Sequence, residues 1–243
     1  MTFTNQYKQT LALQFYRIKG SIVLFTVIQI IMALGIAIGF SYLFYDADSQ
    51  SMLLLATGAP TMVIIITGLV VVPMNVANAK IEGYGEFLRT LPVNRAAIIM
   101  ADTFIWLLVT LPGIIISLVV THLLFAPGFI ISWWFIPAYL LCAITCIGVG
   151  YGYAYAMKPY VAMSLSQIIA FAALMFSPIN FPTSRLPLWL QVIHSILPVD
   201  AMAQIMRATL AVGTFDVNVS TIIRVLVWCI GGYIVSVLIL NKK

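Results

Sequence analysis

Six long apolar runs constrain the fold of this chain more than any other feature of its sequence. A helix needs about 20 mostly apolar residues to cross the hydrocarbon core of a bilayer, which is ~30 Å thick. All six runs meet or approach this length, and we expect the fifth to extend toward residue 181. They cover residues 21–44, 51–72, 98–122, 129–157, 161–176 and 221–240. The sequence therefore predicts an all-α membrane protein with six transmembrane helices.

The composition supports the same fold class. Apolar residues make up 63% of the 243 residues and charged residues only 8%, whereas an ordinary soluble domain is roughly 25% charged. So few charges cannot cover the surface of a soluble fold, and the surplus apolar side chains must face lipid. Because no stretch is long and polar enough to fold separately, we predict one transmembrane domain over residues 1–243. The first run is too long for the core of a cleaved signal peptide and is predicted to be a retained span.

The distribution of Lys and Arg predicts the orientation of the chain. With a cytoplasmic N-terminus, three basic residues lie outside, namely Arg185, Arg207 and Arg224. The other nine lie inside: Lys8, Arg17, Lys19, Lys80, Arg89, Arg95, Lys158, Lys242 and Lys243. We therefore expect a multi-pass protein of the bacterial inner membrane with both termini in the cytoplasm. The net charge of +5 follows from this insertion and does not indicate a nucleic-acid partner.

Three segments are neither spans nor short loops, and the first lies within residues 1–20. Its apolar residues fall on one helical face: Tyr7, Leu11, Phe15 and Ile18. This pattern predicts an amphipathic helix in the headgroup layer, with its basic side toward anionic membrane lipids. A simple anchor that sets the topology is the alternative.

The second segment is a cytoplasmic loop over residues 79–96. Glu82 and Glu86 are four residues apart and Glu86 and Arg89 three, which suits a short helix on the membrane surface, and Pro92 is expected to end it. A solvated turn is the alternative, but apolar and charged side chains together also suit contact with a soluble partner. The candidate contact residues are Glu82, Tyr84, Glu86, Phe87, Leu88 and Arg89.

The third segment is an outer one, residues 177–213. Its two apolar stretches, 186–197 and 201–212, are each too short to cross a bilayer. Proline residues punctuate the whole segment. We predict a re-entrant helical hairpin between the fifth and sixth spans, dipping back into the outer leaflet.

The chain lacks the motifs of an enzyme or a metal site. No Gly-rich phosphate loop ending in Gly-Lys-Ser/Thr occurs, so ATP binding by that mechanism is excluded. Cys142 and Cys146 share a helix face with no nearby His or carboxylate, and we expect them to be buried small apolar residues. His122 and His194 stand alone and are expected to be structural. We therefore assign no catalytic residue, no metal ligand and no bound cofactor to this chain.

Asp102 is the only carboxylate within a predicted span. Burying its charge is costly, so an intramembrane carboxylate is by default a functional candidate. Its position near the cytoplasmic end predicts pairing with Arg95 or Lys80, and a proton-relay role is the alternative.

Small residues recur at helix spacing in two of the runs. Gly35 and Gly39 are four residues apart in the first run, and Gly148, Gly150 and Gly152 cluster in the fourth. Both groups predict close helix approach.

The outer segment and the cytoplasmic loop together resemble the type-2 ABC (ATP-binding cassette) exporter permeases. That family has a Ser/Pro-containing end to the fifth span, an aromatic-Pro pair, a Leu-Pro before a short Trp-containing helix, and then a helix bearing an Arg. The matching outer positions are Pro178, Phe181, Pro182, Leu186, Pro187, Trp189, Pro198 and Arg207; those in the loop are Thr90, Leu91, Pro92 and Arg95. Leu197-Pro198 departs from the Asn-Pro of many members, which bears on the subfamily.

The resemblance implies a permease subunit of an ATP-driven exporter. A separate cytoplasmic ABC ATPase dimer would bind ATP and Mg²⁺, and a second permease, identical or paralogous, would complete the pathway. The ATPase would contact the loop residues named above. Spans rich in aromatic residues and Met but poor in charge suit an amphipathic or lipophilic cargo such as a drug, a hydrophobic peptide or a lipid-linked molecule.

Three other functions compete with general export. The same architecture would serve an immunity permease that removes a bacteriocin-like peptide for self-protection. A membrane-embedded lipid-modifying enzyme would need convergent acids, His residues or a metal cluster, which the sequence lacks. A channel would need polar stripes along the spans, and these are also absent.

Overall fold

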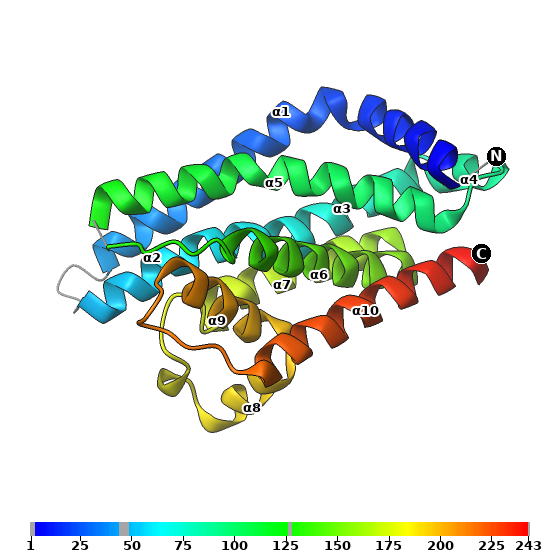
Figure 1. The fold of residues 1–243 in the computed structure, drawn as a ribbon. Coiled ribbons are helices and arrows are strands. Elements are labelled where there is room, and N and C mark those ends of the chain that lie inside the picture. The colour runs from blue at the N-terminus through cyan, green and yellow to red at the C-terminus, as the bar shows by residue number, and fades with distance from the viewer. Residues whose placement is uncertain (1–2, 44–48, 126–127, 243) are drawn as a thin grey trace.

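Helices form almost the whole of the computed structural model, which describes residues 3–43, 49–125 and 128–242 (Figure 1). Within those ranges there is no β-strand, only an isolated bridge between Ile130 and Ala211. The helices in chain order are α1 (Phe3–Leu43), α2 (Ser49–Ile66), the π-helix η1 (Thr67–Val71), α3 (Val72–Ile81), α4 (Tyr84–Thr90), α5 (Arg95–Phe125), α6 (Phe135–Ala156), α7 (Pro159–Phe176), the 3-10 helix η2 (Thr183–Arg185), α8 (Leu188–Ile196), α9 (Pro198–Leu210) and α10 (Val219–Lys242).

Six helical stretches within the described ranges are long and apolar enough to cross a membrane. Each overlaps one of the predicted runs, so the six-span prediction is confirmed there. A seventh apolar unit, α8 with α9, is bent by 78° between its two helices. The six stretches are Thr4–Gly39, Ser51–Ile81, Arg95–Leu124, Phe135–Ala156, Pro159–Phe176 and Val219–Asn241.

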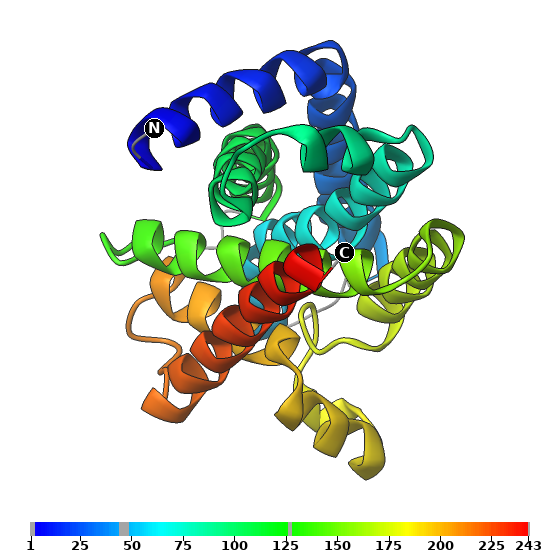
Figure 2. The ribbon, with the colours of Figure 1, turned by 90° about the vertical axis from the view of Figure 1, so that its right-hand side faces the viewer.

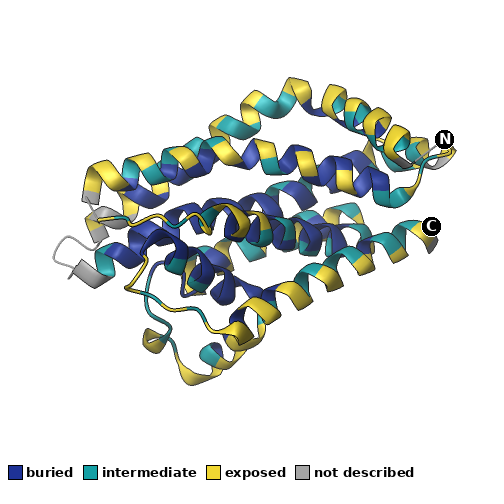
Figure 3. Ribbon diagram, viewed as in Figure 1, coloured by how far each residue is buried: buried dark blue, intermediate teal, exposed yellow. Residues whose placement is uncertain are grey.

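The second span is the centre of the bundle. Its most apolar window is 94% buried by the rest of the chain, against 17% for the spans formed by α7 and α10. Figure 3 shows the contrast: α2 is almost uniformly buried, while the outer helices alternate between buried and exposed residues. A helix that is apolar on all sides can be covered by protein or by lipid; here protein covers the second span and leaves the lipid contact to the others.

A polar contact from α6 repairs a break in this central helix. Pro73 has no N–H, so the carbonyl of Leu69, four residues earlier, loses its usual helical partner. The hydroxyl of Tyr153 donates to that carbonyl at 2.5 Å. Because lipid offers no replacement donor, the Tyr153 hydroxyl of α6 supplies the partner that the Leu69 carbonyl would otherwise lack.

Glycine residues allow α6 to approach both the central helix and α10 closely. A Cβ added at Gly150 would collide with the carbonyl oxygen of Gly68, and Gly148 and Gly152 both lie against Gly232 of α10. The prediction of close packing in the fourth span is therefore confirmed.

The corresponding prediction for the first span is wrong within this chain. A Cβ added at Gly35 or Gly39 would meet nothing within 4 Å. The side of α1 that carries these glycines faces away from the other helices, so backbone contact does not explain them.

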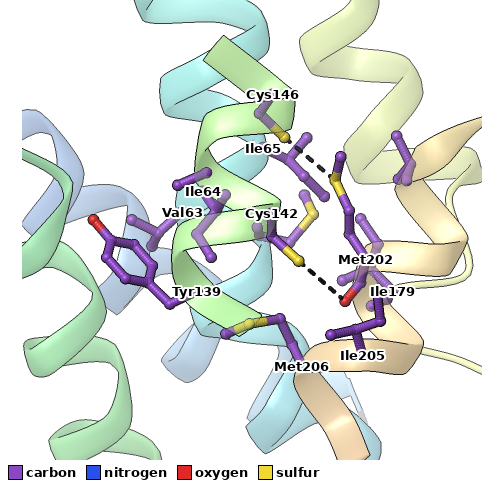
Figure 4. Close-up of a cluster of buried hydrophobic side chains, with 14 of the residues drawn as sticks. Val63, Ile64, Ile65, Tyr139, Cys142, Cys146, Ile179, Met202, Ile205 and Met206 are labelled. Atoms are coloured by element: carbon purple, nitrogen blue, oxygen red, sulfur yellow. Dashed lines mark hydrogen bonds between the residues drawn. The ribbon is translucent and has the colours of Figure 1, made fainter. Parts of the chain in front are cut away.

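Helix α9 packs into the main core with its methionine side chains against α6 (Figure 4). The Cys146 Sγ atom lies 3.4 Å from the Met202 Sδ atom, and the Cys142 Sγ atom lies 4.0 Å from the Met202 carbonyl. Both cysteines are free and buried, as predicted for small apolar residues.

Three predicted boundaries differ from the structure. The N-terminal amphipathic segment and the first span form one helix, α1, whose N-terminal part is bent relative to the rest (Figure 1). Helix α6 begins at Phe135 and not at residue 129, because the backbone of Ile130 and Ser132 instead bonds the last carbonyls of α9, at 3.1 and 2.8 Å. The fifth span ends at Phe176, since Ser177 is extended ahead of Pro178.

We predict opposite effects of the same substitution at two helical glycines. Gly150→Ala places its Cβ against a backbone carbonyl that cannot rotate away, and should lower the free energy of unfolding by about 1–3 kcal/mol, as overpacking does. Gly35→Ala adds a Cβ in open space and should be neutral or stabilising by up to about 1 kcal/mol. Thermal unfolding of the two variants in the same detergent compares them, and equal midpoints would contradict the packing described above.

Candidate functional site

The segments predicted to contact a partner gather at one end of the bundle. Figure 1 shows the N-terminus, α4 and the C-terminus at this end, and Figure 2 views the bundle from it. The ends of α3, α6 and α10 and the starts of α5 and α7 also meet here, around one cavity. We call this end the loop end.

A tight turn sets the position of α4. Helix α3 ends at Ile81, and Gly83 then adopts φ 74°, a left-handed conformation that glycine adopts at no steric cost. Helix α4 ends before Leu91, which is extended ahead of Pro92. The predicted short helix and its end before the proline are thus confirmed, but Glu82 lies before the turn and not on the helix. The expected spacing of Glu82 and Glu86 along one helix is therefore wrong.

Tyr84 joins α4 to α1. The Arg17 guanidinium lies 4.3 Å from the centre of the Tyr84 ring, and the Tyr84 hydroxyl donates to Gln14 Oε1 at 3.3 Å. Arg17 also donates to Asn75 Oδ1 at 2.6 Å. Burial raises the pKa of the Tyr84 hydroxyl, so it remains a neutral donor. These contacts connect three segments that lie far apart in the sequence.

The outer side of α4 is exposed. Glu86 and Phe87 are exposed, Phe87 by 46%, and Glu82 is exposed just before the helix. Leu88 is half-buried, and its carbonyl accepts a hydrogen bond from Arg95 Nη1 at 2.6 Å. The side chain of Arg89 lies outside the described part of the structure. The five candidate contact residues with described side chains thus divide into a pair that contacts the rest of the chain, Tyr84 and Leu88, and an exposed group, Glu82, Glu86 and Phe87.

Lys80 caps the end of α6, a role the sequence did not indicate. Its Nζ atom donates to the carbonyls of Ala154, Tyr155 and Met157 at 2.7, 3.0 and 3.0 Å. These carbonyls belong to the last turn of α6 and the residue that follows it, where no intrahelical donor remains. Lys80, which the sequence analysis used only to predict the orientation of the chain and a pairing with Asp102, therefore also stabilises the end of α6.

Asp102 has a different partner from the one predicted. It is buried, and its Oδ2 atom accepts a hydrogen bond from the Tyr151 hydroxyl at 2.6 Å. The two cations predicted to pair with it donate to backbone carbonyls: Arg95 to Leu88, and Lys80 to the end of α6. The second carboxylate oxygen, Oδ1, has no hydrogen-bond partner among the described residues.

A cavity of about 580 Å³ lies behind α4. Its apolar wall includes Val76, Ile98, Ile239 and Leu240. Its charged side chains are Arg17, Lys80, Arg95, Lys158, Glu86 and Asp102. The cavity thus combines an apolar wall with an excess of two positive charges.

The predicted outer-hairpin residues lie around α8 and α9, and part of the set organises the interior. Arg207 is buried, and its Nη2 atom donates to the carbonyls of Pro178 and Ile179 at 2.8 and 2.5 Å. Pro198 occupies the first turn of α9, where its missing N–H has no cost. Of the full set, Pro178, Pro198 and Arg207 are buried, Phe181 and Pro182 are half-buried, and Pro187 and Trp189 are exposed.

Comparison with known proteins identifies one family. Residues 5–211 match the family described as "ABC-2 type transporter". The match includes the first five spans, α4, α8 and α9. No curated protein sequence matches the chain.

The role of Lys80 predicts a specific loss of stability. Lys80→Met leaves three carbonyls at the end of α6 without their charged donor and should cost about 2 kcal/mol or more of unfolding free energy. Lys158→Met, an exposed lysine near the same cavity, should change stability by less than about 0.5 kcal/mol. Chemical unfolding in detergent measures both, and a Lys80 variant as stable as the Lys158 variant would contradict the capping role.

Proposed function

Because the chain belongs to the ABC-2 type transporter family and is a membrane permease component, we propose that it exports an amphipathic or lipophilic cargo. The cargo would be a drug, a hydrophobic peptide or a lipid-linked molecule taken from the cytoplasm or the inner leaflet. Export needs an energy source, and the sequence contains no phosphate-binding loop. A separate cytoplasmic ABC ATPase dimer therefore binds ATP and Mg²⁺ and drives the permease.

The main support for this proposal is the distribution of side chains around α4. Apolar bulk and charge stand together among its exposed residues, in Phe87 and in Glu86, which also borders the cavity behind the helix. A docking surface needs the first for packing and the second for register. On its inner side, Tyr84 contacts Arg17 of α1. A movement of α4 is thereby passed to the first span through a contact that is already formed.

We also propose how the chain is oriented in its membrane. The loop end lies in the cytoplasm with both termini, and the membrane is the bacterial inner membrane. The N-terminal part of α1 lies in the headgroup layer, and α8 with α9 forms a re-entrant hairpin in the outer leaflet. Exposed Leu188, Trp189 and Ile196 on α8 and the 78° bend before α9 support that hairpin. A second permease, identical or paralogous, completes the pathway.

A double substitution on α4 tests the docking surface. Glu86→Arg with Phe87→Ala reverses the charge and removes the apolar bulk, and should reduce co-purification of an ABC ATPase encoded beside this chain by about tenfold or more. ATP hydrolysis stimulated by the permease should fall in parallel. Both are measured on tagged protein from co-expressing membranes.

The matched control also reverses one negative charge and truncates one apolar side chain, at the other end of the bundle. Asp216→Arg with Val219→Ala alters an exposed carboxylate just before α10 and the exposed valine that begins it, and should leave ATPase binding unchanged. Full ATPase retention by the α4 variant would remove the basis for this docking surface. Cargo transport by the purified chain in liposomes without any ATPase would refute the energy source proposed here.

A further inference from the structure

A π-helical turn interrupts the central span just before α3, and neither docking on α4 nor the capping of α6 requires it. In η1 the Val72 N–H donates to the carbonyl of Thr67, five residues back. In an α-helix it would donate to Gly68, four residues back, so the wider turn contains one residue more. Turns of this kind are rare and frequently lie at functional sites, which makes η1 a candidate for a moving part of the permease.

Pro73 makes this turn costly. It has no N–H, so it donates neither to Leu69, four residues back, nor to Gly68, five residues back. Val72 donates to Thr67, so the Gly68 carbonyl has no helical donor from that residue either. A continuous α-helix through Pro73 would satisfy Gly68 and leave only Leu69 without a donor. Because a missing donor is costly away from water, contacts from outside the helix must hold the turn.

These contacts come from α6 and α7. The Tyr153 hydroxyl donates to the Leu69 carbonyl at 2.5 Å, and its oxygen lies 2.9 Å from Ser166 Oγ of α7. A Cβ added at Gly68 would lie 2.3 Å from the Cys146 Cβ atom, so the backbone of η1 lies directly against α6. Neighbouring helices thus hold the present form of η1, and Tyr153 is the side chain that hydrogen-bonds it.

The two sides of η1 are held differently. On one side, protein encloses the last turn of α2, where Val63, Ile64 and Ile65 are 2%, 1% and 0% exposed. On the other side, α3 continues into α4 after the tight turn at Gly83. A push on α4 therefore acts on α3, and α3 meets the enclosed α2 at η1 and Pro73. Helices bend at prolines and at π-helical turns.

Space beside α3 gives such a bend a direction. Val76, Ala79 and Lys80 of α3 line the cavity of about 580 Å³ behind α4, and Ile98 and Asp102 of α5 line it too. Helix α3 can thus approach α5 by filling space that already exists, without displacing a packed helix. Lys80 joins α3 to α6 through a flexible four-carbon stem, which can follow a small displacement.

We propose that η1 and Pro73 form a hinge, about which α3 and α4 move together into this cavity. The movement begins when the ATPase presses on α4, so this inference rests on the docking proposed above and adds the part of the central span that bends. Tyr153 is the positioning residue of the hinge, because its bond to Leu69 sets the resting angle between α2 and α3. Without that bond, α3 and α4 take up a wider range of positions.

Spin-label distances on the purified chain test the hinge without any ATPase. Labels at Glu82, exposed after the end of α3, and at Tyr160, 73% exposed at the start of α7, report the position of α3 and α4. Labels at Tyr160 and at Leu238, 54% exposed on α10, form a reference pair outside the moving part. Each site is substituted by cysteine in a Cys229→Ser background, because the other two thiols are buried.

Tyr153→Phe removes the hydroxyl and keeps the ring. We expect it to shift or broaden the Glu82–Tyr160 distance by about 2 Å or more, the size of helix displacements in switching proteins, and to leave the reference pair unchanged. Ser166→Ala is the matched control, since it removes the other partner of the Tyr153 hydroxyl and leaves the bond to Leu69. Its distances should equal those of the wild type.

Pro73→Ala tests the same hydrogen bond from the other side. It restores a backbone N–H four residues after Leu69, so adding it to Tyr153→Phe should return the Glu82–Tyr160 distance to the wild-type range. In complexes from co-expressing membranes, Tyr153→Phe should lower permease-stimulated ATP hydrolysis by about fivefold or more, with co-purification of the ATPase unchanged.

Three results would overturn the hinge: wild-type distances in Tyr153→Phe, an equal shift in Ser166→Ala, or an equal shift of the reference pair. Where Tyr153→Phe does not fold, Pro73→Ala alone should narrow the Glu82–Tyr160 distribution, because a restored N–H stiffens the helix, and an unchanged width would contradict the proposal. An ATPase that does not bind the wild-type chain would contradict the docking on α4 and not the hinge, since the distances are measured on this chain alone.

Discussion

Every backbone carbonyl inside a bilayer must find its donor within the protein, and the architecture of this chain depends on that constraint. Side chains satisfy it at four breaks or ends of the described helices. Tyr153 serves the carbonyl that Pro73 leaves open, Lys80 serves the end of α6, and Arg207 serves the segment after α7. Trp228 does the same for the last carbonyl of α8. The helices are thus connected by polar contacts at the points where each one would otherwise be weakest.

The same constraint connects the loop end to the spans. Arg17, Tyr84 and Asn75 form a polar connection between α1, α4 and α3, and none of these groups faces hydrocarbon alone. A partner that pushes α4 therefore acts on α1 through a short, already satisfied contact. Within the described cavity, Asp102 Oδ1 is the exception.

Sequence patterns predicted single segments well and contacts between them poorly. Hydrophobic runs located the six spans, and Pro92 located the end of α4, because both depend on local backbone and solvent chemistry. The prediction for Asp102 missed its partner Tyr151, because the charges of Arg95 and Lys80 indicated a salt bridge, whereas α6 brings a neutral hydroxyl to the carboxylate. The prediction that glycines allow close helix packing was right for α6 and wrong for α1. Spacing within one helix does not show whether another helix packs against that face.

The sequence by itself determined that the chain is a six-span helical membrane protein with no phosphate-binding loop, because apolar length and motif absence are properties of the linear chain. Only the tertiary structure decided that α2 is the covered helix, that α4 faces outward through Glu86 and Phe87, and that a charged cavity lies behind it. These depend on which helices pack together. That choice is made by contacts such as Gly150 with Gly68 and Tyr153 with Leu69, between residues more than 80 positions apart.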